Sequence, residues 1–331
     1  MKILYAFQGT GNGHASRAIE IIPYLQLKAE VDVLISGHQC ELKFPFEIKY
    51  KYYGLSFIFG KKGGIDFKQT LQKLRLNNLF KEIKSIPIED YDLIINDFEP
   101  VTAWAVKLRN IPIISLSHQN AVLDKHSPKY GMYKLERLIL KYYAPSKIKF
   151  GFHFQPYSSS IFTPIIRKKI RYKNRTNKGH YTVYLPAYSD KKIIKVLSEF
   201  KDVKWQVFSK HTKQHQLHNN IFIQPINGSE FIRSMASSSG VLCGAGFETP
   251  AEALYLQKKL LVIPMKNQYE QQCNALSLKK MGVTVLKKFN KKQYKKISKW
   301  IKSNETIKVE YSDNTEDILE AIILPYHNET M

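Results

Sequence analysis

The sequence predicts an α/β protein with two domains, each built on a parallel sheet. At the N-terminus an apolar strand, residues 2–7, leads through a glycine-rich loop into a helix whose apolar residues from Ala18 to Leu25 follow helical spacing. Apolar strands then alternate with helices up to residue 154, and a second alternating set begins at Tyr181. The length of 331 residues allows two domains that each bury a core.

The first domain is expected to cover residues 1–156. Asp97 and His118 end neighbouring strands in it, and open parallel sheets bind ligands at the carboxyl ends of their strands. A dinucleotide site is disfavoured, because the loop lacks the third glycine of that fingerprint and Asp32 begins its strand rather than ending it. The expected strands are 2–7, 31–36, 91–98, 111–118 and 147–154, and the later helices are 68–84, 100–109 and 129–143.

Residues 44–67 interleave aromatic residues with lysines. One interpretation is structural, with two edge strands and a flexible turn at 61–64. The other is an acceptor-side surface, since aromatic faces stack on sugar rings and aromatic-basic mixtures suit membrane interfaces. We favour the structural interpretation.

A basic segment that contains Pro164, residues 157–180, is expected to link the domains. The second domain, residues 181–312, repeats the alternation of the first, and the basic stretch 287–296 is interpreted as the solvated face of a helix. Its expected strands are 181–186, 205–209, 221–225, 240–243 and 260–264; its helices are 191–200, 228–235 and two more from about residues 249 and 267; a last helix, 315–324, carries Ile318, Leu319, Ile322 and Ile323 on one side.

A glycine turn in the second domain is typical of an anion-binding site. Gly244 and Gly246 follow a buried strand, and Thr249 and Pro250 mark a helix start as N-cap and first helical residue. Glycines let the backbone approach a ligand closely, and the free N–H groups at a helix start attract an anion. Glu252 would face that ligand from the first turn.

The order of glycine turn, Thr, Glu, apolar strand ending in Pro, Gln-Gln and Asn-Ala resembles the donor half of GT-B glycosyltransferases, especially the bacterial N-acetylglucosaminyltransferase of lipid II synthesis. The N-terminal sequence GTGNGHASRA resembles the glycine loop of the same enzymes. The resemblance implies two Rossmann-like domains that face each other across a cleft. It also implies that the last segment, 313–331, packs back on the first domain.

The resemblance assigns roles to particular residues. It implies that Glu252 holds the nucleotide ribose, that Gln271 or Gln272 holds the donor sugar, and that the helix start faces the diphosphate. The donor-binding residues would be Gly244, Gly246, Phe247, Thr249, Glu252, Gln271, Gln272 and Ser189, and the acceptor-side residues Gly11, Asn12, Gly13 and His118. Ser189 is an open prediction, because the chain has LPAYSD where many relatives carry a glycine-rich turn.

Transfer from a nucleotide sugar needs a base for the acceptor hydroxyl and a site for the departing diphosphate. His14 is the candidate general base, and Asp97 would orient its imidazole. The alternatives are a structural role for His14 and a capping role for Asp97 at the helix that starts at Pro100. We predict neither a metal nor a cofactor, because no carboxylate pair of the DxD type sits in a suitable loop and KHTKQHQLH, which holds His211, reads as an exposed segment.

The formal net charge of +23 has three interpretations: compositional bias, attraction to an anionic membrane surface, or nucleic-acid binding. The chain has 43 lysines and eight arginines, which disfavours nucleic acid, because readers of nucleic acid rely on arginine. No apolar run is long enough for a membrane span, and the N-terminus lacks the features of a signal peptide. We expect a cytoplasmic protein, peripheral to the membrane if the charge has a function, with reduced cysteines.

Three functions follow, in order of preference. The first is an inverting, metal-independent glycosyltransferase that moves a hexose or N-acetylhexosamine from a UDP-sugar, such as UDP-N-acetylglucosamine, to a glycan or lipid-linked acceptor of the cell envelope. The second is a nucleotide-sugar epimerase of the same fold. The third is a non-enzymatic basic protein that binds nucleic acid or anionic glycans.

Overall fold

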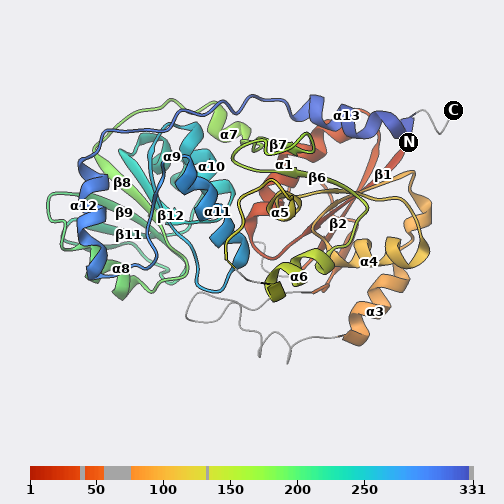
Figure 1. Cartoon of the computed structure of the whole chain (residues 1–331), viewed down its shortest axis with the longest axis horizontal. Helices are drawn as coiled ribbons and strands as arrows, with labels where there is room; N and C mark the ends of the chain where they lie inside the picture. The colour runs from red at the N-terminus through yellow and green to blue at the C-terminus, as the bar shows by residue number, and fades with distance from the viewer. Residues whose placement is uncertain (38–41, 56–75, 132–133, 328–331) are drawn as a thin grey trace.

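The computed structural model describes residues 1–37, 42–55, 76–131 and 134–327. Two seven-stranded sheets form the two halves of the molecule (Figure 1). The first has the order β3 (Tyr50–Tyr52), β2 (Glu30–Ser36), β1 (Lys2–Gln8), β4 (Leu93–Asp97), β5 (Ile114–Leu116), β6 (Ile148–Phe152), β7 (Ile161–Phe162), all parallel. The expected α/β fold is confirmed.

The second sheet is also parallel except at one edge. Its order is β10 (Gln216–His218), β11 (Ile221–Pro225), β9 (Lys204–Ser209), β8 (His180–Tyr184), β12 (Gly240–Gly244), β13 (Lys259–Ile263), β14 (Thr284–Val285). The antiparallel edge strand β10 was not predicted, because its three residues are exposed and polar at both ends. The central strands read as continuous apolar runs because both faces of each sheet are covered by helices.

Helices connect the strands in each half. In the first they are α1 (Asn12–Gln26), α3 (Leu76–Ser85), α4 (Pro100–Arg109), α5 (His118–Leu123), α6 (Lys134–Tyr143) and α7 (Lys168–Arg171). In the second they are α8 (Asp190–Leu197), α9 (Gly228–Ser237), α10 (Glu248–Tyr255), α11 (Tyr269–Lys280) and α12 (Tyr294–Lys302), with α13 (Thr315–His327) last. Part of the helix expected at 68–84 and the turn expected at 61–64 lie outside the described residues, as does Cys40, one of the three cysteines expected to be reduced.

The start of α4 shows which carboxylate caps it. Glu99 is the N-cap and accepts hydrogen bonds from the backbone N–H groups of Val101 and Thr102, both at 2.7 Å. The alternative in which Asp97 caps this helix is therefore wrong, because Asp97 still belongs to β4 and its carboxylate points elsewhere.

Two boundaries differ from the sequence prediction. The strand expected at 111–118 ends at Leu116, because Ser117 caps α5 by accepting a hydrogen bond from Asn120 N at 3.3 Å. The basic stretch 287–296, expected to be the solvated face of a helix, lies mostly before the α-helix α12 begins at Tyr294. It passes through a short 3-10 turn before α12, and Phe289 within it is fully buried.

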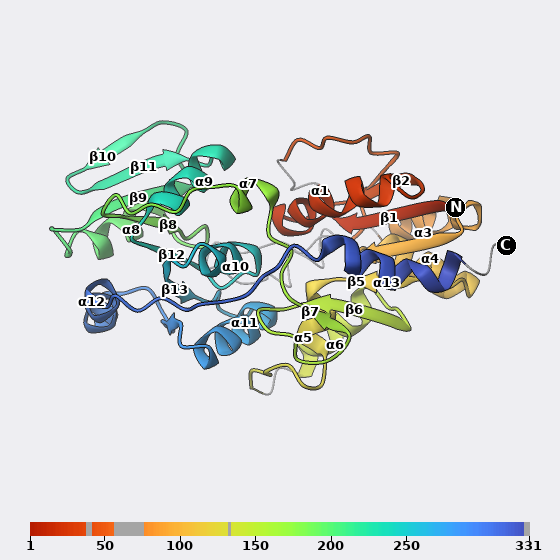
Figure 2. The same ribbon diagram turned by 90° about the horizontal axis from the view of Figure 1, so that it is seen from above.

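The chain returns to the first half at its end. After α12 it crosses from the second half to the first, where α13 lies along the N-terminal domain (Figure 2). The apolar side of α13, with Ile318, Leu319, Ile322 and Ile323, is buried in one core cluster with Ile21 and Ile22 of α1. The strand β7 pairs with β6 inside the expected linker, so the first sheet continues past residue 156.

Candidate active site

A pocket of about 460 Å³ lies between the two halves and holds most of the predicted site residues. Its first side is formed by the loop and helix start after β1 and by the start of α5; its second side is formed by the turn after β12 and the start of α11. The predicted residues that line it are Gly11, Asn12, Gly13, His14, His118, Gly246, Phe247, Thr249, Glu252 and Gln271. Both sheets thus direct the carboxyl ends of their strands to one ligand-sized space.

The loop after β1 needs its glycines. Gly11, the N-cap of α1, has φ +95°, a conformation that side chains with a Cβ rarely adopt. A Cβ on Gly13 would lie 3.3 Å from Oε2 of Glu248, so the loop and the second domain approach each other closely there.

His14 and Asp97 form a hydrogen-bonded pair at the bottom of this side. His14 Nδ1 lies 2.8 Å from Oδ1 of the fully buried Asp97, whose two oxygens also accept from Arg17 Nε at 2.9 Å and Nη2 at 3.0 Å. Burial raises the pKa of the Asp97 carboxyl, but Arg17 and His14 outweigh that effect and hold the pKa below its ordinary value. Asp97 is therefore ionised and fixes the imidazole of His14.

The outer nitrogen of His14 faces the pocket. Gln119 Nε2 lies 3.5 Å from His14 Nε2 and donates to Glu270 Oε2 at 3.0 Å, so one amide connects the histidine to the second domain. Burial raises the pKa of Glu270, an effect that His14 and Gln119 oppose. Gln119 and Glu270 were missed, although each is the chain neighbour of a predicted residue, His118 and Gln271.

His118 bridges the halves rather than offering its ring to a ligand. Its Nδ1 lies 2.7 Å from the carbonyl oxygen of Phe152, its Nε2 lies 2.9 Å from Asn274 Oδ1, and its ring stacks on Phe247 at 3.9 Å between centroids. Burial lowers the pKa of His118 to about 3, although both oxygen partners act in the opposite direction. The side chain contacts the pocket, but both ring nitrogens are engaged inside the protein.

The helix on the second side begins two residues earlier than predicted. Phe247 is the N-cap of α10 and makes no capping hydrogen bond with its side chain, so the expectation that Thr249 is the N-cap is wrong. The helix begins earlier because the buried Phe247 already has near-helical angles, φ −93° and ψ −56°. Thr249 nevertheless lines the pocket from the first turn, and nothing lies within 4 Å of the place of a Cβ on Gly246.

Glu252 has a partner that the sequence did not suggest. Its buried carboxylate accepts from Arg167 Nε at 2.5 Å and Nη2 at 2.8 Å. Arg167 comes from the basic segment before α7, which was interpreted only as a linker, and it lines the same pocket.

Four predicted donor residues either lie outside the pocket or have side chains engaged within the protein. Gln271 lines the pocket, but its Oε1 accepts from the backbone N–H of Met265 at 3.0 Å, and Gln272 donates to Met265 O at 2.8 Å without lining the pocket. Gly244 ends β12 behind the turn and is not among the lining residues. Ser189 is exposed at the start of α8, outside the pocket, because the loop after β8 turns away into that helix.

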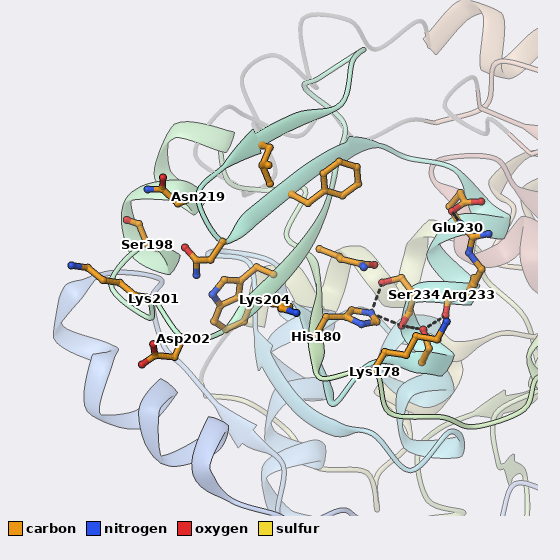
Figure 3. Close-up of a pocket in the computed structure, with 16 residues that line it drawn as sticks. Lys178, His180, Ser198, Lys201, Asp202, Lys204, Asn219, Glu230, Arg233 and Ser234 are labelled. Atoms are coloured by element: carbon orange, nitrogen blue, oxygen red, sulfur yellow. Dashed lines mark hydrogen bonds and ion pairs between the residues drawn. The ribbon is translucent and has the colours of Figure 1, made fainter.

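A larger hollow of about 1100 Å³ lies at the opposite, amino-terminal edge of the second sheet (Figure 3). Lys178, Lys201 and Arg233 surround it, and the carboxyl ends of α8 and α9 open on it, so the negative ends of these helices offset the cations. None of the predicted site residues lines it.

Within the described residues, no three His, Cys, Asp or Glu side chains are arranged to hold a metal ion. His211, His215 and His218 are exposed. The part of the chain that the structure describes contains no helix with the length and apolar character needed to cross a membrane.

Comparison with known proteins identifies the family. A family model described as glycosyl transferase family 1 matches residues 1–303. The chain belongs to glycosyl transferase family 1. It is a glycosyltransferase, and the expected enzyme class is confirmed. No curated protein matches its sequence significantly.

Solved structures share the fold of this glycosyltransferase at low sequence identity. MurG from Acinetobacter baumannii is 12% identical with a TM-score of 0.60, over 98% of this chain and 99% of that one. LpCGTa in complex with UDP is 9% identical with a TM-score of 0.63, over 99% of both chains. A UDP-N-acetylglucosamine 2-epimerase is 14% identical with a TM-score of 0.60, over 100% of this chain and 98% of that one. The GT-B fold of two Rossmann-like domains is thereby confirmed.

Proposed function

We propose that this glycosyltransferase moves a hexose or N-acetylhexosamine from a UDP-sugar to a glycan or lipid-linked acceptor, with inversion and without a metal. One observation carries the proposal: the His14–Asp97 pair faces the start of α10 across a single pocket. A base and an anion-binding helix start are the two parts that such a transfer needs.

His14 is the base in this proposal. Because Asp97 engages Nδ1, the lone pair of Nε2 is left to accept the proton of an acceptor hydroxyl in the pocket. The deprotonated oxygen attacks the anomeric carbon from the side opposite the leaving diphosphate, which inverts the configuration. General-base catalysis of this kind contributes roughly 10²–10⁴-fold in rate.

In this proposal the departing diphosphate binds at the start of α10. The N–H groups of the first turn have no partner within the helix, and the helix dipole favours negative charge there. Gly246 leaves open space above its backbone for a phosphate, and Thr249 lines the same edge. The neighbour in complex with UDP supports a uridine nucleotide.

In this proposal the donor sugar binds beside α11. Glu270 and Gln271 line the pocket there and present a carboxylate and an amide to sugar hydroxyls. Glu252 is proposed to hold the ribose while it keeps its contact with Arg167. The UDP-N-acetylglucosamine 2-epimerase among the neighbours supports an N-acetylhexosamine donor. The resemblance of the glycine turns to the lipid II N-acetylglucosaminyltransferase supports a place in cell-envelope synthesis.

Epimerisation is the second candidate because the solved structure of a UDP-N-acetylglucosamine 2-epimerase matches over the whole chain. An epimerase converts its nucleotide sugar without an acceptor, whereas a transferase needs one. The basic binding protein considered from the sequence is not retained, since the family is one of enzymes.

The acceptor is proposed to be met at the cytoplasmic membrane face. On α6 three apolar side chains, Leu135, Leu138 and Tyr142, are exposed by 62%, 51% and 47% at positions i, i+3 and i+7, with exposed Arg137 and Lys141 beside them. An apolar stripe next to cations suits an anionic membrane surface. The helix lies on the lower side of the N-terminal half in Figure 1.

Binding to vesicles tests the membrane surface. The wild type is expected to sediment with vesicles of phosphatidylcholine and phosphatidylglycerol, and Leu135→Glu/Leu138→Glu is expected to lose this binding. Leu324→Glu on α13, a residue with the same 62% exposure as Leu135, is the matched control and should bind like the wild type. Equal binding by all three proteins would place the membrane contact elsewhere.

UDP binding without added metal tests the donor site. Calorimetry is expected to show binding in the micromolar range by the wild type, lost in Glu252→Ala, with Glu316→Ala on the surface of α13 as control. A folded wild-type protein that binds neither UDP nor UDP-sugars would overturn the proposal. Product analysis with and without membrane extract then separates transfer from epimerisation.

A further inference from the structure

Arg17 joins the two sides of the pocket. Its guanidinium has two engaged edges: Nε and Nη2 donate to Asp97, and Nη1 donates to Glu248 Oε1 at 2.8 Å. Arg17 belongs to α1 and Glu248 is the first residue of α10, so this contact crosses from the base to the proposed diphosphate site.

Glu248 occupies a place that favours an anionic ligand. Its carboxylate belongs to the first helical residue of α10, where the unpartnered N–H groups and the helix dipole attract negative charge. Burial raises its pKa, an effect that Arg17 and His14 oppose. The side chain is 24% exposed, so it can turn toward solvent when another anion arrives.

The pocket also contains buried polar atoms without a hydrogen-bond partner among the described residues, and Oε1 of Gln119 is one of them. Gln119 lines it and is 5% exposed, and its Oε1 has no hydrogen-bond partner within the described structure. A buried amide oxygen without a partner is costly, and a hydroxyl of a bound ligand would satisfy it. The site is therefore organised for a ligand that brings both a donor group and an anion.

We infer that Arg17 is a further catalytic residue, whose Nη1 moves from Glu248 to the departing diphosphate while Nε and Nη2 keep hold of Asp97. The inference rests on the proposed function. In the step, the acceptor oxygen forms a bond to the anomeric carbon and its proton passes to His14 Nε2. The bond from the anomeric carbon to the β-phosphate oxygen breaks, and its electron pair stays on that oxygen, where Arg17 and the start of α10 meet the new charge.

The guanidinium of Arg17 suits this role because its charge is permanent and its position is fixed. Arg17 is 5% exposed and remains ionised, since Asp97 and Glu248 more than offset the effect of burial on its pKa. Holding Asp97 with two nitrogens leaves the third directed at α10, so little reorganisation is needed when the diphosphate develops charge. Glu248 keeps that nitrogen satisfied while the donor is absent.

Affinities for uridine and UDP separate the role of Arg17 from that of the rest of the site. In Arg17→Met we expect UDP affinity to fall roughly 10- to 100-fold, the loss of one charge-assisted hydrogen bond, with uridine affinity unchanged. In Glu248→Gln we expect UDP affinity to rise by about 3- to 10-fold, because a competing negative charge is removed. The exposed pair Arg233 and Glu230 on α9 gives the matched controls Arg233→Met and Glu230→Gln.

The outcomes are distinct. A UDP-to-uridine affinity ratio that stays at the wild-type value in Arg17→Met, or that falls in Glu248→Gln, overturns the inference while uridine binding still supports the donor site. A wild type that binds neither ligand overturns the proposed function instead. If Arg17→Met does not fold, Glu248→Gln decides alone, because Arg17 keeps both bonds to Asp97 in that variant.

Discussion

Replacing Asp97 by asparagine perturbs the carboxylate on which the site depends. It is fully buried and takes part in three close contacts, with His14 Nδ1 at 2.8 Å and with Arg17 Nε and Nη2 at 2.9 Å and 3.0 Å. Asparagine keeps the size and one acceptor oxygen but turns an NH2 group toward a donor. Because breaking a buried ion pair by removing one partner costs about 3–5 kcal/mol, we expect that loss in the free energy of unfolding at pH 7.

The loss in the free energy of unfolding should depend on pH in a way that follows from the pKa of Asp97. Burial raises the pKa of Asp97, but Arg17 and His14 outweigh burial and hold it below the ordinary value. A carboxyl with a lowered native pKa contributes stability that is complete above its unfolded pKa of about 3.9 and is lost as the pH falls through the native value. The difference between wild type and Asp97→Asn should therefore be constant from about pH 5 to 8 and shrink below about pH 4.

Urea unfolding at pH 7 and pH 3 measures the difference in unfolding free energy between wild type and Asp97→Asn. In the same variant the rate of sugar transfer at pH 7 should fall roughly 10²–10⁴-fold. Glu89→Gln is the control, because Glu89 is 57% exposed and pairs with Arg109 at the surface, away from the pocket, and should cost about 1 kcal/mol or less. Equal stability of wild type and Asp97→Asn at pH 7, or an equal loss at both pH values, would refute the reasoning.

Three further substitutions test other parts of the molecule. His14→Ala should lower the rate of transfer by roughly 10²–10⁴-fold with little change in melting temperature; a rate within about threefold of wild type would contradict the role of base. Glu99→Ala removes the cap of α4 and should cost about 1–3 kcal/mol in urea unfolding, and a cost below about 0.5 kcal/mol would speak against the cap. Ile322→Ala, in the contact of α13 with α1, should cost about 2–5 kcal/mol, whereas Glu320→Ala on the exposed side should not; equal melting temperatures would argue against that packing.

Local signals in the sequence were enough for the central strands of both sheets and for two candidate site residues that the structure brings together. Alternating apolar strands and helices with glycine turns predicted both sheets, because a buried parallel strand is a short, continuous apolar run. His14 was predicted from its glycine loop and Asp97 from its strand end, and the structure brings them to 2.8 Å. Such signals depend only on neighbours in the chain.

Helix starts were less predictable from local sequence. Thr249 and Pro250 have the residue types of a helix start, yet α10 begins at Glu248. The reason is tertiary: Phe247 is held by its stack on His118 of the first domain, and the backbone enters the helix from that buried position. The packing of Phe247 against the first domain therefore overrode the local preference of Thr249 and Pro250 for a helix start.

The sequence by itself determined the fold class, the glycine loops and the candidates for the proposed base and its partner, His14 and Asp97, since each of these was recognised from its own neighbours in the chain. Only the tertiary structure decided which side chains complete the pocket. Arg17 meets Glu248 across 231 positions, Gln119 meets Glu270 across 151, and Arg167 meets Glu252 across 85. Ion pairs and hydrogen bonds act over a few ångströms in space. The spacing of residues along the chain does not show which side chains come together when the two domains face each other.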